Sequence, residues 1–593
     1  MLGKIIGIEE NTVYVKLDID LRKTESLISL HVLMQSDKRK IVGEITDVKD
    51  DTAYINLLGE IIDDNFVFGV VRKPAFGSKV SLISPDKINK IIGLDDYKED
   101  RDLYLGESSI YEGVKIGVNI DSFFNSHFAI FGSTGSGKSC SVARIIQNLF
   151  SKQDPIPYKA SIFMFDAYGE YHTAFQKLHE KVPQINFKTY TTNLGISDSE
   201  VLKIPLWLLS VDDIALLLEV EKHSQIPIIE KALKYVNVFS NKDESVIKSK
   251  NDILARAILD ILTSGRPAPQ IRDQIFSVLT CYNTPELNLD TIIYQPGYSR
   301  PLKQCLLIDS SGKIRDMELV MNFMEGFLAD DYELSLPDGS FKYTLKDLKD
   351  AFDFALISEG SLKSDKIYDE TNILRVRMHT LVNSETSVYF DYPEYISRND
   401  YIKKLLTADN GSKAQIINFN INYIDDRLAK NITKIYSKLL FDYAKGLDKR
   451  ASVPFHIILE EAHRYVQNDN DKFLLGYNIF ERITKEGRKY GVILGLISQR
   501  PSELSETSLS QCSNFLIFKM LHPKDVEYIR EMIPNITNEV VKRLRILQPG
   551  NCIAFGSAFK VPVLVKMDMP DPAPSSSNCE IGKIWFVSKT KKN

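Results

Sequence analysis

The chain has 593 residues, of which 44% are apolar and 26% are charged, and its formal net charge is −5. At roughly 100 to 200 residues per domain, this length predicts three or four folding units, and the composition excludes a disordered, collagen-like or low-complexity protein. The slightly acidic balance means that any binding to nucleic acid has to come from a local surface and not from the charge of the whole molecule.

The sequence has no signal for secretion or for a membrane anchor. It contains no uncharged apolar run of about 18 residues, and residues 1–12 mix apolar with charged side chains. Six cysteines are scattered without a Cys-x-x-Cys pair, which argues against a zinc ribbon and against a disulfide framework. We therefore expect a soluble protein of the cytoplasm.

The first segment, residues 1–90, consists of short stretches in which apolar and polar residues alternate. Examples are Thr12–Leu17 and Thr52–Leu57, separated from their neighbours by charged or glycine-containing turns. Such alternation is typical of strands with one buried face, so we expect a small N-terminal β-barrel. The charged, non-periodic residues 95–102 indicate a linker into the next unit.

Beyond the linker, short continuous apolar runs alternate with helical patterns, which predicts an α/β fold with a parallel sheet covered on both faces. The predicted strands are His127–Phe131, Ser161–Phe165, Ile416–Phe419, Phe455–Leu459, Val492–Ile497, Phe515–Phe518 and Cys552–Phe555. We assign residues 91–192 and 401–568 to this core. Helical patterns dominate residues 193–400, which we interpret as a helical insertion, and the Pro- and Ser-rich residues 569–593 as an extended arm.

A complete P-loop pattern, Gly-x-x-x-x-Gly-Lys-Ser, lies between a predicted strand and a predicted amphipathic helix. In this motif the backbone N–H groups cradle the β-phosphate, Lys138 reaches the β- and γ-phosphates, and Ser139 offers its hydroxyl to Mg²⁺. The alternative, a glycine-rich turn that matches by chance, lacks this context. The residues predicted to bind ATP are Gly132, Ser133, Thr134, Gly135, Ser136, Gly137, Lys138, Ser139 and the following Cys140.

Hydrolysis also needs carboxylates at strand ends beside the phosphate cradle. The strand ending at Leu459 is followed by Glu460, which we predict to coordinate the metal, and Glu461, which we predict to polarise the attacking water. Alone, the pair is equally compatible with the acidic first turn of a surface helix. Asp166 and Glu170 follow another predicted strand and are further catalytic candidates, with a capping and a solvated role as the alternative.

Two more polar groups complete the predicted catalytic set. Gln499 follows the apolar strand at residues 492–497, where an amide can bond the γ-phosphate and report its loss; the alternative is a plain polar strand end. Arg488 lies in a basic stretch that ends a helix also carrying Arg482. Basic residues are favourable at a helix C-terminus without any catalytic role, so that alternative stays open.

Taken in order, these motifs resemble the HerA branch of the HerA/FtsK superfamily of ring ATPases. The matching stretches are residues 127–139, Asp166 with residues 169–171, Glu460-Glu461-Ala462-His463, residues 486–491, Ser498-Gln499-Arg500-Pro501, and residues 548–550, 556–558 and 562–565. The likeness spans residues 1 to about 575, and the N-terminal barrel resembles the family's HAS domain.

The resemblance implies a RecA-like core that forms a homohexameric ring around double-stranded DNA. ATP would bind between neighbouring subunits, and its hydrolysis would move the DNA through the pore. The family often has an arginine immediately before the histidine that opens the P-loop strand, whereas this chain has Ser126. The arginine finger donated across the interface is therefore Arg488 or Arg482, or it is absent.

The resemblance also implies a partner effector, a nuclease or a sirtuin-like NADase, that docks on the N-terminal barrel. The chain has no nuclease or NADase motif of its own. We expect an ATP-driven, hexameric DNA translocase or helicase acting in anti-phage defence or DNA end processing. The alternative is a nucleotide-dependent ring scaffold that activates a defence effector without moving DNA. A conjugative coupling ATPase and a small-molecule kinase fit the sequence less well, because it shows no membrane segment, acceptor pocket or lid.

Overall fold

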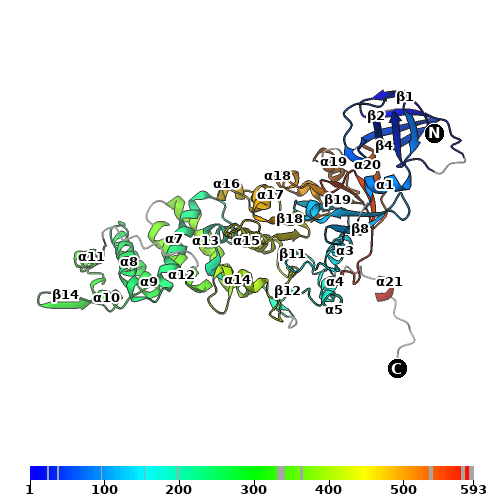
Figure 1. Ribbon diagram of the computed structural model, residues 1–593. Helices are drawn as coiled ribbons and strands as arrows, with labels where there is room; N and C mark the ends of the chain where they lie inside the picture. Colours follow the sequence, from blue (N-terminus) through cyan, green and yellow to red (C-terminus); the bar gives the residue numbers. More distant parts are fainter. Residues whose placement is uncertain are drawn as a thin grey trace. The chain divides into compact units, whose positions relative to one another are not determined.

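The computed structural model describes residues 1–22, 26–36, 39–94, 97–152, 154–195, 199–329, 341–360, 365–532, 538–575 and 581–585 (Figure 1). The chain forms two compact units. The first contains Met1–Glu200, Leu405–Asp469 and Asn478–Asn593, and the second contains Val201–Lys404 and Asn470–Tyr477. The N-terminal barrel and the large sheet both belong to the first unit, and the domain limits expected from the sequence stay a prediction.

The N-terminal segment forms the small β-barrel that its alternating pattern predicts. Its strands are β1 (Gly3–Glu9), β2 (Thr12–Leu17), β3 (His31–Ser36), β4 (Arg39–Lys49), β5 (Thr52–Ile62), β6 (Asn65–Phe68) and β7 (Lys79–Leu82). They follow the order β2-β1-β7-β3-β4-β5-β6, and antiparallel pairing of β2 with β5 closes the sheet. Val13, Val15 and Ile55 point inward and are fully buried, because every second residue of a strand faces the same side.

The large sheet of the first unit contains the predicted core strands. Its members are β8 (Asp102–Ser108), β9 (Lys115–Asn119), β10 (Phe128–Phe131), β11 (Ile162–Asp166), β12 (Phe187–Thr191), β13 (Glu200–Val201), β16 (Ile416–Asn420), β17 (Phe455–Leu459), β18 (Val492–Ser498), β19 (Asn514–Phe518), β20 (Asn551–Gly556) and β21 (Val563–Met567). The order is β13-β12-β16-β11-β17-β18-β10-β19-β20-β21-β8-β9. From β12 to β19 neighbouring strands are parallel, so their carboxyl ends share one edge.

One predicted strand runs in the other direction. β20 pairs antiparallel with β19, and the sheet continues antiparallel through β21, β8 and β9, so the expectation of a parallel strand at Cys552–Phe555 was wrong. The reason is where the chain re-enters the sheet. Gly550, just before β20, donates its N–H to the carbonyl of Ser136 at 2.9 Å, so β20 starts beside the P-loop, where the parallel strands end.

Helices pack on this sheet through apolar stripes. In α3, Val142, Ile145 and Ile146 are buried, as their spacing predicts. The helices of the first unit are α1 (Pro85–Ile92), α2 (Ile120–Phe124), α3 (Lys138–Phe150), α4 (His172–Gln176), α5 (Leu178–Lys181), α15 (Asp426–Lys445), α17 (Ile479–Tyr490), α18 (Glu506–Ser510), α19 (Pro523–Met532), α20 (Asn538–Leu544) and α21 (Ile581–Ile584).

The second unit is mostly helical, and it also contains a hairpin of β14 (Ile292–Gln295) and β15 (Tyr298–Pro301) that sequence patterns did not predict. Its helices are α6 (Val211–Leu217), α7 (Ile226–Ser240), α8 (Ile247–Leu262), α9 (Ala268–Cys281), α10 (Leu302–Cys305), α11 (Met317–Glu325), α12 (Leu345–Ala355), α13 (Asp365–Asn383), α14 (Arg398–Leu405) and α16 (Asp471–Leu475). Within the described residues, no helix of either unit combines the length and the apolar character needed to cross a membrane.

The described part of the C-terminal arm, residues 569–575, lies on the P-loop helix and its neighbour α4. The buried Gln147 of α3 donates its amide to the carbonyls of Pro572 (2.8 Å) and Ala174 (3.1 Å) and accepts from the N–H of Asp571 (3.0 Å). Ser575 donates its N–H to the carbonyl of Glu170 at 2.8 Å. The arm is therefore tied to the loop that holds Glu170, while residues 576–580 and 586–593 lie outside the described residues.

We predict that Gln147→Leu loosens this arm. The substitution removes three hydrogen bonds and leaves the buried carbonyl of Ala174 without this donor, at a cost of about 1–3 kcal/mol for a buried group left unpaired. We expect a lower unfolding midpoint and faster proteolysis within residues 569–575, measured by chemical denaturation and by mass spectrometry of limited digests. Lys181→Ala is the matched control, because the Lys181–Asp571 ion pair is exposed and solvent screens it. Equal effects of the two variants would contradict the role of Gln147.

Candidate active site

The P-loop connects the end of β10 to the start of α3, in the strand, loop and helix context that the motif requires. Gly135 and Gly137 have φ values of +72° and +103°, which residues with a side chain rarely adopt. A Cβ added to Gly132 would lie 2.6 Å from both Phe518 Cβ and Ser136 Oγ. The backbone path of the loop therefore depends on these three glycines.

Lys138 begins α3 and is 9% exposed. Its Nζ donates to the carbonyls of Gly132 (2.7 Å) and Ser133 (3.2 Å). Burial lowers the pKa of Lys138, while the charges of Glu461, Glu460 and Glu170 act in the opposite direction. The ammonium group thus lies within the loop and close to three carboxyl groups.

The loop offers groups that suit a bound polyphosphate. Ser136 Oγ is buried and makes no hydrogen bond to any described residue. Among the described residues, the Lys138 ammonium bonds only backbone carbonyls, which phosphate oxygens would replace as stronger acceptors. An orphaned hydroxyl, a buried cation and three permissive glycines fit the triphosphate of a nucleotide.

Strand β18 lies between β10 and β17, so three strand tips meet at one edge of the sheet. The tip of β18 carries Gln499, whose Oε1 accepts a hydrogen bond from Thr134 Oγ1 of the P-loop at 2.8 Å. The backbone N–H of Gln499 also hydrogen-bonds the Glu461 carboxylate at the tip of β17. The structure thus places Gln499 between the phosphate loop and the predicted water-polarising residue.

Glu461 has a backbone conformation that is rare for residues other than glycine. Its φ and ψ are +47° and +46°, in the left-handed region, and such strain is concentrated at functional sites. The carboxylate is buried, and burial raises its pKa, although the charges of Lys138 and Arg464 lower it. The strained turn directs Glu461 toward the P-loop lysine.

Glu460 faces the neighbouring strand β11, where it meets Asp166. The two carboxyl groups hydrogen-bond each other, and Glu460 Oε2 also accepts from the N–H of Ala167 at 3.1 Å. Burial is the main cause that raises the pKa of both groups, and that of Glu460 rises well above its ordinary value. The pair therefore shares a proton, held on Glu460.

Asp166 is completely buried, and its other contacts hold the chain that follows β11. Its carboxylate accepts from the N–H groups of Glu170 and Tyr171, both at 3.0 Å, and from Asn418 Nδ2 at 3.3 Å. These bonds position the turn that carries Glu170. The predicted direct catalytic role of Asp166 stays a prediction, and the observed contacts favour a positioning role.

Glu170 reaches the first turn of α3, where its carboxylate hydrogen-bonds Ser139. Burial raises the pKa of Glu170, and the pair of Lys138 and Ser139 lowers it. Burial, together with the charge of Glu170, raises the pKa of the Cys140 thiol, so Cys140 stays protonated near neutral pH. Ser139 and Glu170 thus lie beside the lysine of the P-loop.

Arg488 lies at the opposite edge of the sheet. It is exposed near the end of α17, which leads through Gly491 into the start of β18. Its charge acts on His127 at the start of β10, and burial lowers the pKa of His127 to about 4. Since β18 has seven residues at about 3.3 Å each, Arg488 is roughly 20 Å from the P-loop of its own chain.

Arg482, the second finger candidate, lies two turns earlier on α17. It faces Glu486 at 3.8 Å and its guanidinium lies 5.6 Å from the centre of the Phe441 ring. Ser126, at the position where the family often has arginine, is buried.

Comparisons with known proteins show that this chain is similar to HerA helicases. Residues 103–289 match the family described as the central domain of the helicase HerA. The chain is 24% identical over 588 residues to the DNA double-strand break repair helicase HerA of Sulfurisphaera tokodaii, covering 94% of this chain and 92% of that protein. It is 22% identical over 592 residues to the probable HerA of Methanocaldococcus jannaschii, covering 98% of both.

The expected resemblance to HerA is confirmed. It extends over nearly the whole chain and includes the P-loop strand and helix. Among solved structures, VirB4 of Thermoanaerobacter pseudethanolicus overlaps 80% of this chain with 98% of its own, at 12% identity and a TM-score of 0.44.

Sequence reasoning gave no role to two residues of this HerA-like site. His463 Nδ1 lies 3.1 Å from Ser498 Oγ and 3.2 Å from Glu461 Oε2. Both residues belong to the motifs that carry the resemblance, and that was the only signal available for them. Their contact joins positions 35 residues apart, so it became visible only in the fold.

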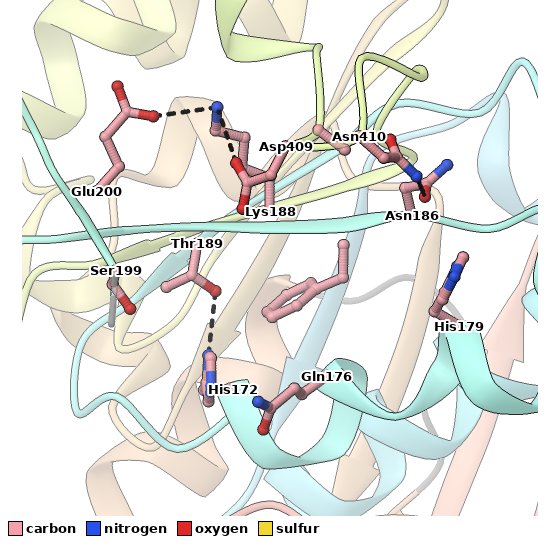
Figure 2. Close-up of a pocket in the computed structure, with 12 residues that line it drawn as sticks. His172, Gln176, His179, Asn186, Lys188, Thr189, Ser199, Glu200, Asp409 and Asn410 are labelled. Carbon is pink, nitrogen blue, oxygen red and sulfur yellow. Dashed lines mark hydrogen bonds and ion pairs between the residues drawn. The ribbon is translucent and has the colours of Figure 1, made fainter. Parts of the chain in front are cut away.

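A separate polar cavity of about 580 Å³ lies beside strand β12, next to the edge strand β13 (Figure 2). Lys188 lies 3.1 Å from Glu200 and 3.9 Å from Asp409, and His172 Nδ1 lies 3.1 Å from Thr189 Oγ1. Its lining includes none of the predicted site residues. The described residues also hold no group of three or more His, Cys, Asp or Glu arranged to bind a metal ion.

We predict that Glu460→Gln stabilises the protein when nucleotide and metal are absent. The folded-state pKa of Glu460 is raised, so the native protein keeps a proton that the unfolded chain releases above about pH 4.3. The free energy of unfolding contributed by this group therefore falls as the pH rises from there toward the folded pKa. Glutamine keeps a neutral donor toward Asp166 without that loss.

Urea unfolding in EDTA at pH 5 and pH 8 tests this. We expect Glu460→Gln to raise the unfolding midpoint at pH 8 more than at pH 5. Asp166→Asn is the control that should lower the unfolding midpoint. It replaces a carboxylate oxygen, which accepts from the N–H groups of Glu170 and Tyr171, with an amide NH₂ group, which cannot accept. A lower midpoint for Glu460→Gln at pH 8 would contradict the shared proton.

Proposed function

We propose that this protein is an ATP-hydrolysing motor that moves along or unwinds double-stranded DNA. One observation carries the proposal: the P-loop, Glu461 and Gln499 meet at three adjacent strand tips. The near full-length similarity to proteins named as DNA double-strand break repair helicases supports DNA as the substrate.

In this proposal each residue has a separate task. The backbone N–H groups of the P-loop and Lys138 bind the phosphates, and Gln499 senses the γ-phosphate. Ser139 and Glu460 would hold Mg²⁺, which would neutralise charge on the phosphates. Glu460 has to lose the proton it shares with Asp166 before it can do so. Glu461 orients the attacking water.

We further propose a homohexameric ring with a catalytic arginine contributed by the neighbouring subunit. Arg488 lies at the sheet edge opposite its own P-loop, so it can reach a nucleotide only on another copy of the chain. An arginine of this kind contributes on the order of 10³ to 10⁵ in rate.

A partner effector, a nuclease or a sirtuin-like NADase, would dock on the N-terminal barrel, in anti-phage defence or DNA end processing. The barrel unit exposes large apolar side chains after β5, among them Phe68, Val71 and Phe76, and Val71 is 93% exposed. These three side chains lie within nine residues of one another in the chain, and an exposed apolar patch is typical of a surface that contacts another protein.

ATP turnover with and without a linear DNA duplex tests the motor. We expect Lys138→Ala to lose ATP binding, because it removes the only side-chain cation of the P-loop motif. Glu461→Gln should bind ATP normally and lower kcat on the order of 10²- to 10⁴-fold. DNA should raise the ATP turnover of the wild-type protein, and the protein should displace a labelled strand or a protein block from the duplex. If DNA leaves ATP turnover unchanged while a partner enzyme is still activated, the alternative of a nucleotide-dependent ring scaffold is favoured.

The ring makes a prediction about mixed subunits. Doping wild-type protein with increasing fractions of Arg488→Ala should reduce ATP turnover more steeply than in proportion to that fraction, because each variant subunit disables its neighbour's site. Lys489→Ala, the adjacent exposed cation, is the control and should leave turnover unchanged. A strictly proportional loss with Arg488→Ala would argue against donation between subunits.

A further inference from the structure

His463 lies directly behind the predicted catalytic carboxylate. It belongs to a short 3₁₀ turn, Ala462–Arg464, that begins immediately after Glu461. Its side chain is mostly buried, with Nδ1 at 3.1 Å from Ser498 Oγ and 3.2 Å from Glu461 Oε2. One nitrogen of the imidazole therefore faces two oxygens at the tips of two different strands.

The two oxygens differ in what they already bind. Ser498 Oγ accepts the N–H of Arg500 at 2.9 Å. Glu461 Oε2 is buried and accepts no hydrogen bond from the described residues. An unpaired buried carboxylate oxygen is costly, because it loses its hydration without gaining a hydrogen bond. A small rotation of the imidazole would direct an N–H at Nδ1 onto that oxygen.

The protonation state of the His463 imidazole agrees with this arrangement. Burial lowers the pKa of His463, and the charges of Arg500, Arg464 and Lys138 act in the same direction, against that of Glu503. The imidazole is therefore neutral near pH 7 and carries one N–H. Placing that proton on Nδ1 lets it be donated to Ser498 or to Glu461.

We propose that His463 is a positioning residue for hydrolysis, whose Nδ1–H holds the Glu461 carboxylate in place and links it to Ser498 at the tip of β18. This inference rests on the proposed ATP hydrolysis. To that function it adds the residue that fixes the position of Glu461, the water-orienting group. The left-handed backbone of Glu461 aims the side chain, and His463 restrains the oxygen that the Gln499 N–H leaves free. The same contact ties the position of the carboxylate to Ser498, the residue before Gln499.

Two substitutions at His463 separate positioning from packing. His463→Leu keeps the volume and removes the donor, while His463→Asn places an amide N–H close to the position of Nδ1. We expect His463→Leu to lower kcat on the order of 10²-fold, as for other misplaced catalytic groups, and His463→Asn to recover most of that loss. Both variants should bind a fluorescent ATP analogue in the presence of Mg²⁺ with nearly wild-type Kd, and should unfold at nearly the wild-type temperature.

The control is His179→Leu, at a histidine of α5 that also lines the polar cavity, which should leave kcat unchanged. Equal kcat losses in the leucine and asparagine variants, or a weaker Kd that accounts for the loss, would overturn the proposal. Wild-type kcat in His463→Leu would also overturn it.

A double variant distinguishes this inference from the function on which it rests. If His463 acts through Glu461, adding His463→Leu to Glu461→Gln should cause no further loss of kcat. Multiplicative losses would overturn the positioning role and leave the proposed hydrolysis intact. Normal turnover by Glu461→Gln alone would instead remove Glu461 from the proposed function, and His463 would lose its role with it.

Discussion

Lys138 carries a buried positive charge next to three carboxyl groups, and the other contacts of the site are arranged around that charge. In a protein interior the attraction between unlike charges is stronger than in water, but each charge also loses its hydration. Here the loop carbonyls of Gly132 and Ser133 solvate the ammonium, and Glu461 lies within its field. A triphosphate would meet a cation that is already desolvated and correctly placed, so little reorganisation is needed on binding.

The carboxyl groups on either side of this lysine are not equivalent. Glu460 is neutralised by the proton it shares with Asp166, whereas Glu461 faces Lys138 and the N–H of Gln499. Two adjacent glutamates in one sequence motif thus have different environments, because successive residues leave a strand tip in different directions. A left-handed residue and a buried carboxyl pair both cost stability, as is common where a site is built for function.

The order of the strands decides which residues are in contact at their tips. β18 lies between the P-loop strand and β17, so its tip touches both neighbours: Gln499 contacts Thr134 on one side, and Ser498 contacts His463 on the other. A shift of that tip on loss of a phosphate would reach the Glu461 carboxylate through the N–H of Gln499, which already bonds it. The arm that covers α3 adds a further restraint, because Ser575 holds the backbone of Glu170.

Much of this protein is determined by local patterns. Alternating residues are enough to specify barrel strands, continuous apolar runs specify the buried strands of the sheet, and the P-loop motif needs only its own backbone geometry and the helix that follows. The tertiary structure alone decided the antiparallel direction of β20, the proton shared by Asp166 and Glu460, the contact of His463 with two strand tips, and the docking of the arm on Gln147. These features depend on groups that lie far apart in the chain and become neighbours only when the sheet is assembled. Local propensity and spacing carry no information about which distant group will lie next to a given residue in the folded protein. They also do not say whether burial will leave a carboxyl group charged.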